Sequence, residues 1–144
     1  IADGINDPHN LGALIRCAEA AGCHGLIIPK RRSVALTATV AKASAGAIEH
    51  LRIAKVTNLA TTVEELKKLG VWIYAAEADG QDLNSTEIIT PAAFVLGSEG
   101  EGVSRLVREK SDFVLSIRMK GKVNSLNVSS AGAVILFHAQ KFFK

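Results

Sequence analysis

Five short hydrogen-bonding side chains stand within seven positions just before the last apolar run of the chain. They belong to the segment NSLNVSSAGAVILF and are Asn124, Ser125, Asn127, Ser129 and Ser130. A single such side chain, Ser125 or Asn127, is enough to cap a helix. The remaining amides and hydroxyls suit hydrogen bonds to an adenine edge or a ribose. The cluster is therefore a candidate ligand site, and a capped helix beside a surface loop is the structural alternative.

A glycine-rich segment, FVLGSEGEGVSRLV, is the second place where polar chemistry collects. Gly97, Gly100 and Gly102 would let backbone N–H groups approach a ligand closely. The spacing matches neither the dinucleotide fingerprint nor a P-loop. Glu99 and Glu101 would repel a phosphate and would suit a cationic ligand better. A plain tight turn between a strand and a helix is the alternative.

The third candidate segment is DGINDPHNLGALIRCAEAAG, near the start of the sequence. Asp7 followed by Pro8 predicts a helix start, because aspartate caps helices and proline suits their first position. Arg16 falls opposite the apolar face of this helix, on the same side as His9. Such an arginine is either solvated or holds a phosphate or a developing oxyanion.

Apolar runs alternate with helical patterns and supply the elements that would position these groups. Nearly continuous apolar runs, typical of strands covered on both faces, occupy 25–29, 52–56, 71–76, 92–97 and 113–117. Helices are expected at 10–22, 58–70, 102–110 and 127 to about 143, and a polar surface loop at 77–86. The alternation predicts an α/β domain with a mainly parallel sheet flanked by helices. Ligands of such sheets bind beyond the carboxyl ends of the strands.

The composition is that of a globular protein of single-domain length. Of the 144 residues, 48% are hydrophobic and 22% are charged, and no apolar run reaches the roughly 18 residues of a membrane helix. Two cysteines, Cys17 and Cys23, are too few for a disulfide framework. With no leader-like segment before the first motif, we expect a cytoplasmic protein without membrane association.

The net charge of +3 permits a polyanionic partner. The cations gather in two clusters: Lys30, Arg31 and Arg32, and Arg118, Lys120 and Lys122.

Taken in order, the three segments resemble the motifs of one family, the SpoU class of the SPOUT RNA ribose 2′-O-methyltransferases. The matching motifs are DPHNLGALIRCAEAAG, FVLGSEGEGVSRLV and MKGKVNSLNVSSAGAVILF. The resemblance runs over essentially the whole chain, and residues 27–51 look like the branch that methylates a guanosine of 23S ribosomal RNA. It implies S-adenosyl-L-methionine as methyl donor, a ribose 2′-hydroxyl of RNA as acceptor, and no metal. It also implies a deep trefoil knot near the C-terminus and a homodimer formed through the C-terminal helix region.

The same resemblance assigns roles to individual residues. The catalytic set would be Arg16, Asn10, Glu99, Ser125 and Asn127. The donor would contact Leu96, Gly97, Glu99, Ile117, Met119, Ser125, Leu126 and Asn127. RNA would contact Arg16 and the two basic clusters. Because a guanidinium is costly to deprotonate, we expect Arg16 to clamp the phosphate beside the target ribose and to stabilise the developing alkoxide.

Three alternatives stay open at this point. The chain could be a tRNA 2′-O-methyltransferase, a non-catalytic RNA-binding homologue, or a nucleotide-dependent enzyme of the Rossmann type. The last would need a glycine fingerprint after the first strand, and DGINDPHN is not one. Residues 1–144 are expected to form a single SPOUT catalytic domain. Members acting on ribosomal RNA usually carry a small RNA-binding domain ahead of it. We therefore expect the sequence to be a catalytic fragment, and the alternative is that target recognition comes from elsewhere.

Overall fold

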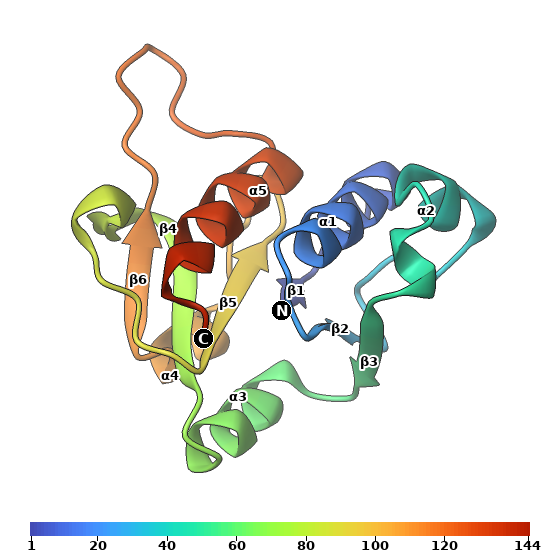
Figure 1. Cartoon of the computed structure of the whole chain (residues 1–144), viewed down its shortest axis with the longest axis horizontal. Coiled ribbons are helices and arrows are strands. Elements are labelled where there is room, and N and C mark those ends of the chain that lie inside the picture. Colours follow the sequence, from blue (N-terminus) through green and yellow to red (C-terminus); the bar gives the residue numbers. More distant parts are fainter.

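The computed structural model describes all 144 residues as parallel strands and helices that alternate along the chain (Figure 1). One sheet has four strands in the order β1-β5-β4-β6, and a second sheet consists of β2 and β3. Every pairing is parallel, which confirms the predicted sheet type. The strands are β1 Ala2–Asp3, β2 Gly25–Pro29, β3 Arg52–Val56, β4 Trp72–Asp82, β5 Ala92–Gly97 and β6 Phe113–Ser116.

Five α-helices accompany the strands, and three of them begin at caps that the sequence predicts. Asp7 accepts a hydrogen bond from the backbone N–H of His9 at 2.8 Å. Asn58 and Asn127 cap their helices in the same way. The helices are α1 Pro8–Ala20, α2 Ala38–Ala43, α3 Leu59–Lys68, α4 Arg105–Lys110 and α5 Val128–Ala139. Short 3₁₀ helices occupy Ala47–Glu49, Leu83–Ser85 and Gln140–Phe142. Not one of these helices has both the length and the apolar character that crossing a membrane requires.

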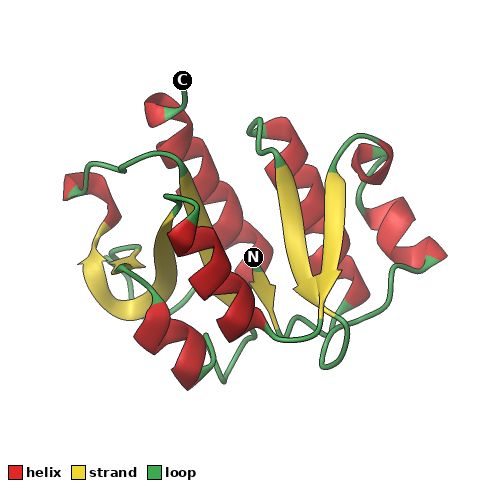
Figure 2. Ribbon diagram, turned by 90° about the horizontal axis from the view of Figure 1, so that it is seen from below, coloured by secondary structure: helices red, strands yellow, loops and turns green.

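Helices cover the four-stranded sheet on both faces (Figure 2). Successive residues of a strand point to opposite faces, so β4 and β5 contribute to two separate cores. Tyr74, Phe94 and Leu96 belong to the core with α1 and α5. Ile73 and Val95 belong to the core with α3 and α4. The continuous apolar character of these two strands therefore reflects burial on both faces, as predicted.

The strand β3 departs from that prediction. It is the free edge of the two-stranded sheet, where Arg52, Ala54 and Lys55 are exposed. An apolar run does not by itself show whether a strand lies at the centre or the edge of a sheet. No element was expected for β1 or α2, which are too short for a clear periodic pattern.

The predicted polar loop at 77–86 is also wrong. The strand β4 continues to Asp82 and pairs with β6 again after an irregularity between Ala76 and Gln81. Ser116 of β6 donates a hydrogen bond to the carbonyl of Gly80 at 3.0 Å, and a 3₁₀ helix follows the strand. The segment is polar because its side chains make ion pairs and face solvent, and this does not prevent strand formation.

Candidate active site

A cavity of about 680 Å³ lies where the carboxyl ends of β5 and β6 and the middle of β4 meet the segment before α5. Figure 1 shows the chain between β6 and α5 as a long loop that projects beyond the sheet at this end. All eight residues that the resemblance assigns to the methyl donor line the cavity: Leu96, Gly97, Glu99, Ile117, Met119, Ser125, Leu126 and Asn127. Segments that are distant in sequence therefore share one hollow.

The sequence interpretation missed the contribution of β4 to this cavity. Ala76, Glu77 and Ala78 line the wall beside the ends of β5 and β6. Ala76 ends the strand expected at 71–76, where the rule on carboxyl ends of parallel strands applies. The surface loop expected at 77–86 leaves out Glu77 and Ala78. The remaining lining residues are Ser98, Gly100, Glu101, Gly102, Leu115, Ser116, Asn124, Val128, Ala131 and Ile135.

The glycine-rich loop after β5 folds back on itself at the cavity wall. The backbone N–H of Gly102 donates to the carbonyl of Ser98 at 2.8 Å. A Cβ added to Gly97 would lie 2.0 Å from the carbonyl carbon of Gly102, which leaves no room for any side chain. Gly102 itself has a φ of +69°, in the left-handed region that favours glycine. Gly100, with a φ of +88°, lies in the same region, so the turn itself requires all three glycines.

Asn127 connects the three motifs through its side-chain amide. Its Nδ2 donates to Oδ1 of Asn10 at 2.9 Å and to Oε1 of Glu99 at 3.0 Å. Its Oδ1 accepts from the backbone N–H of Ser129 at 3.0 Å and from the Ser129 hydroxyl at 2.6 Å. Two of the five side chains of the polar cluster, those of Asn127 and Ser129, are thus bound within the protein, where Asn127 caps the helix and fixes Asn10 and Glu99. Ser125 is exposed, lines the cavity and makes no hydrogen bond within the protein.

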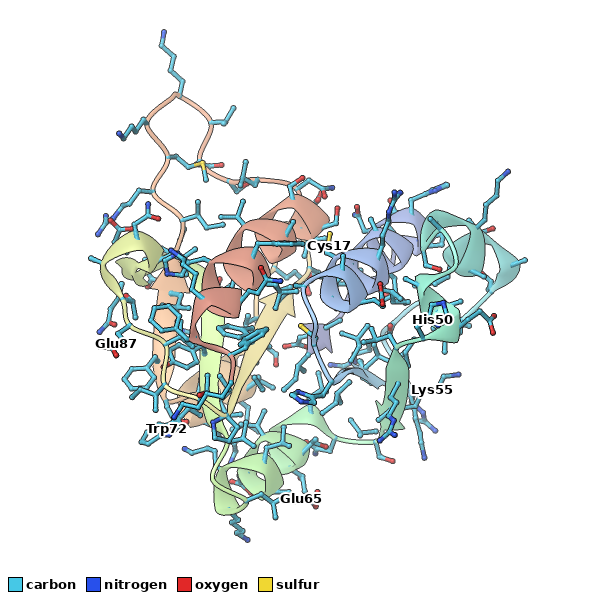
Figure 3. All side chains as sticks on the ribbon, viewed as in Figure 1. Cys17, His50, Lys55, Glu65, Trp72 and Glu87 are labelled. Carbon is cyan, nitrogen blue, oxygen red and sulfur yellow. The ribbon has the colours of Figure 1, made fainter.

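Arg16 lies outside the cavity wall. It is exposed on α1 and makes no ion pair. The next residue, Cys17, lies where α1 faces the start of α5 (Figure 3), with its Sγ 3.9 Å from the carbonyl oxygen of Ser129. Burial raises the pKa of the Cys17 thiol, and the neighbouring Arg16 guanidinium opposes that shift. The residue next to Arg16 therefore reaches the start of α5, and Arg16 itself forms no ion pair with any acid of the chain.

The charge of the cavity is one-sided. Three carboxylates, those of Glu77, Glu99 and Glu101, are among its 21 lining residues, and no Lys, Arg or His is. The two basic clusters are exposed and lie outside this wall. Arg32 instead lines a second hollow of about 550 Å³ beside the glycine-rich loop. No group of His, Cys, Asp and Glu side chains is arranged to hold a metal ion.

Comparison with known proteins identifies the family of the chain. The model of the SpoU rRNA methylase family matches residues 1–137. The chain belongs to that family. It is 54% identical over 142 residues to a Staphylococcus haemolyticus protein assigned to the TrmH family of tRNA/rRNA methyltransferases, covering 98% of this chain and 57% of that protein. It is 50% identical over 142 residues, with the same coverage, to the Bacillus subtilis protein YacO, which is assigned to the same family.

Solved structures of family members agree with this fold. A TrmH-family protein from Porphyromonas gingivalis superposes with a TM-score of 0.91 at 31% identity, covering 99% of this chain and 58% of that one. The SpoU methyltransferase AviRb from Streptomyces viridochromogenes, in complex with the cofactor AdoMet, gives a TM-score of 0.87 at 26% identity, with 98% and 58% coverage. This chain therefore spans only a little over half the length of these relatives.

Proposed function

We propose that this chain is the catalytic domain of an S-adenosyl-L-methionine-dependent RNA methyltransferase that acts on a ribose 2′-hydroxyl. The observation that carries the proposal is the charge of the cavity, with three carboxylates and no cationic side chain in a protein of net charge +3. A sulfonium donor is attracted to such a site, whereas a nucleotide phosphate is repelled. Membership of the SpoU family and the AdoMet complex of AviRb support the same ligand.

The residues present fit such a donor. The cavity volume of about 680 Å³ falls within the range of roughly 300–1,000 Å³ that is usual for small-molecule sites. Leu96, Ile117 and Leu126 give apolar walls for an adenosine, and the open hydroxyl of Ser125 gives a polar partner. Gly97, Met119, Glu99 and Asn127 complete the proposed donor contacts.

The proposed mechanism depends on positioning. The bound donor supplies a methyl group on a positively charged sulfur. Asn127 binds both Glu99 of the cavity wall and Asn10, which lies outside that wall, and a fixed site lowers the entropic cost of bringing the ribose oxygen into line. Arg16, which has no ion-pair partner in the chain, would bind the phosphate beside the target ribose and stabilise the developing alkoxide. A guanidinium stays protonated at neutral pH, so this role is that of a clamp.

We assign the RNA backbone to the exposed cations around the cavity. The cluster Lys30, Arg31 and Arg32 and the cluster Arg118, Lys120 and Lys122 are exposed, and only Arg118 approaches an acid, at 3.9 Å from Asp82. For the acceptor we favour a guanosine of 23S ribosomal RNA, because residues 27–51 resemble that branch. A tRNA acceptor is the second candidate, since both tRNA and rRNA stand in the names of the relatives.

Two further properties of the family belong to this proposal. The segment 117–127 between β6 and α5 would pass through a loop of the chain to form the trefoil knot. The exposed apolar side chains of α5, Val134 at 43% and Phe137 at 45%, would pack against a second copy.

The relatives are longer than this chain, so we also propose that target recognition needs a further RNA-binding domain. Residues 1–144 would then bind donor but methylate RNA poorly.

Two measurements test the proposed function. Isothermal titration with S-adenosyl-L-methionine should show one saturable site, and a protein that releases no heat on titration would contradict the donor assignment. Incorporation of labelled methyl groups into ribosomal and transfer RNA then identifies the acceptor. Nuclease digestion should place the label on the ribose 2′-oxygen, and label on a base would contradict the proposed reaction.

A further inference from the structure

The three carboxylates of the cavity differ in how firmly the protein holds them. Glu99 is exposed and already accepts hydrogen bonds from the Asn127 amide and the Val128 backbone. Glu101 is exposed and makes no hydrogen bond. The side chain of Glu77 is only 19% exposed, so solvent screens its charge least. Glu77 is therefore the carboxylate of the cavity whose charge solvent screens least.

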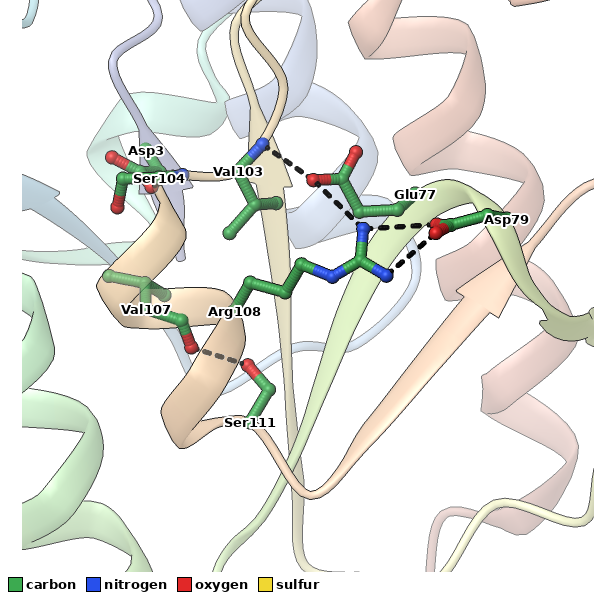
Figure 4. Close-up of polar contacts among 8 residues, drawn as sticks. All are labelled: Asp3, Glu77, Asp79, Val103, Ser104, Val107, Arg108 and Ser111. Carbon is green, nitrogen blue, oxygen red and sulfur yellow. Dashed lines mark hydrogen bonds and ion pairs between the residues drawn. The ribbon is translucent and has the colours of Figure 1, made fainter.

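Glu77 is anchored through only one of its two oxygens (Figure 4). Its Oε1 accepts the backbone N–H of Val103 at 3.1 Å and lies 4.0 Å from Nη1 of Arg108. Its Oε2 has no hydrogen-bond partner in the protein and borders Gly102, where an added Cβ would approach it to 2.8 Å. A carboxylate accepts through both oxygens, so one acceptor on the cavity wall is left for a ligand.

The nearby guanidinium does not cancel this charge. Arg108 is bound by both oxygens of Asp79, with Nη1–Oδ1 at 3.0 Å and Nη2–Oδ2 at 2.8 Å. This pairing lowers the pKa of Asp79 and raises the pKa of Arg108. Two carboxylates and one guanidinium leave a net charge of −1 in this cluster. Because the better ion pair is formed with Asp79, the uncompensated charge lies on Glu77.

We propose that Glu77 makes the cavity prefer the methyl donor over the demethylated product, S-adenosyl-L-homocysteine. This inference rests on the proposed function. Donor and product carry the same adenosine and amino-acid groups and differ in charge only at sulfur, which is a sulfonium in the donor and a neutral thioether in the product. A fixed, partly buried carboxylate attracts the first and not the second. Glu77 thus acts as a specificity-determining residue that favours donor binding and product release.

The test compares the dissociation constants of both ligands in Glu77→Gln and in the unchanged chain. Glutamine keeps an oxygen for the Val103 N–H and removes only the charge. We expect the ratio of the product and donor dissociation constants to fall about tenfold. A tenfold change corresponds to a charge interaction equivalent to one pKa unit. The product constant should hardly change. Glu65→Gln removes the same charge from the exposed side of α3, away from the cavity, and should leave both constants unchanged (Figure 3).

A second variant separates charge from structure. Glu77→Asp keeps the charge and should keep the preference for donor over product, even if both ligands bind more weakly. If Glu77→Gln does not fold, the inference is tested by Glu77→Asp. Equal weakening of donor and product by Glu77→Gln, an unchanged preference, or a preference lost in Glu77→Asp would overturn the inference. Failure of the unchanged chain to bind donor would overturn the proposed function, and the inference with it.

Discussion

The cavity and its basic surroundings are built in opposite ways. The cavity wall is acidic, and several of its polar side chains are held by the protein: Asn127 binds Asn10 and Glu99, and Val103 binds Glu77. The surrounding cations at 30–32 and 118–122 are exposed and largely without partners. Hydrogen bonds within the protein hold these cavity side chains in place before a ligand binds, whereas the exposed cations have few contacts that would fix them.

This difference matches two substrates of opposite charge. A small cation binds most tightly to a site whose groups are already in place and whose charge is poorly screened by solvent. A long polyanion such as RNA gains from many exposed cations whose contribution depends on salt. Because the two regions share almost no side chains, changes in one should leave the other intact. Five changes test that separation.

The largest effect is expected from Gly97→Ala. The new Cβ would overlap the backbone of Gly102 at 2.0 Å, so the glycine-rich loop must move and donor binding should be lost. Overpacking of this kind typically costs about 1–3 kcal/mol of stability. Titration with donor and urea denaturation measure the two effects. The control is Gly121→Ala, since Gly121 has open space around it; equal behaviour of the two variants would contradict the prediction.

Arg16→Lys should affect turnover without affecting donor affinity. Lysine keeps the charge but cannot bind a phosphate with two parallel hydrogen bonds, and we expect kcat to fall about 10²-fold, as when an enzyme is deprived of a transition-state donor. The donor dissociation constant should not change, because Arg16 is not part of the cavity wall. Steady-state kinetics with RNA provide the measurement, with the exposed Arg52→Lys as control. Near-normal turnover would exclude the clamp.

Asn127→Ala should disturb both stability and the cavity. Loss of the helix cap is worth about 0.5–2 kcal/mol, and Glu99 and Asn10 lose a shared partner. Asn58→Ala is the matched control, because Asn58 caps α3 through the Thr61 N–H at 3.1 Å and has no place in the cavity wall. Urea denaturation should show similar losses for the two variants. Only Asn127→Ala should weaken donor binding, and an equal effect on donor affinity would contradict the role assigned to Asn127.

A combined Lys120→Gln and Lys122→Gln change should affect RNA only. The slope of log affinity against log salt concentration should fall by about 0.7–0.9 for each phosphate that the variant no longer neutralises, and donor affinity should stay the same. Filter binding over a salt series measures the slope. Lys68→Gln, on exposed α3, should leave it unchanged. If the double variant keeps the full slope, the 118–122 cluster does not bind the RNA backbone.

The smallest effect is expected from Asp79→Asn, which should change how the stability of the protein depends on pH. Arg108 lowers the pKa of Asp79 in the folded state, so the ion pair stabilises the protein above the unfolded pKa of about 3.9. That stability is lost as the pH falls through the lower, folded pKa. The variant should therefore lose slightly less stability than the unchanged chain between neutral and acidic pH in urea denaturation.

A second acid serves as its comparison. Lys110 lowers the pKa of Glu64, so Glu64→Gln should show the same small change in acid stability. Only Asp79→Asn frees Arg108 to neutralise Glu77, and only this variant should reduce the preference for donor over product. A reduced preference in Glu64→Gln would show that the cavity responds to distant charge.

Local patterns predicted most of the fold. The strands β2, β3 and β5 have the bounds expected from their apolar runs, and α1 and α3 start at their expected caps. The helix α4 begins later than expected, at Arg105, because the glycine-rich turn extends through Gly102. Short elements such as β1 and α2 have too few residues for a periodic signal. Prediction also failed at Glu77–Asp82, where the strand is stabilised by residues of β6 and α4 that are distant in sequence.

The sequence alone determined the types of the longer elements, three of the helix caps and the three motif segments, because each depends on residues within a few positions of one another. It also indicated the eight proposed donor residues through the family resemblance. The tertiary structure decided which of the acids share one wall, that Asn127 joins Asn10 to Glu99, and that Arg108 pairs with Asp79 and leaves Glu77 its charge. These interactions join residues 28 to 117 positions apart, and only the path of the folded backbone brings such side chains within hydrogen-bonding distance.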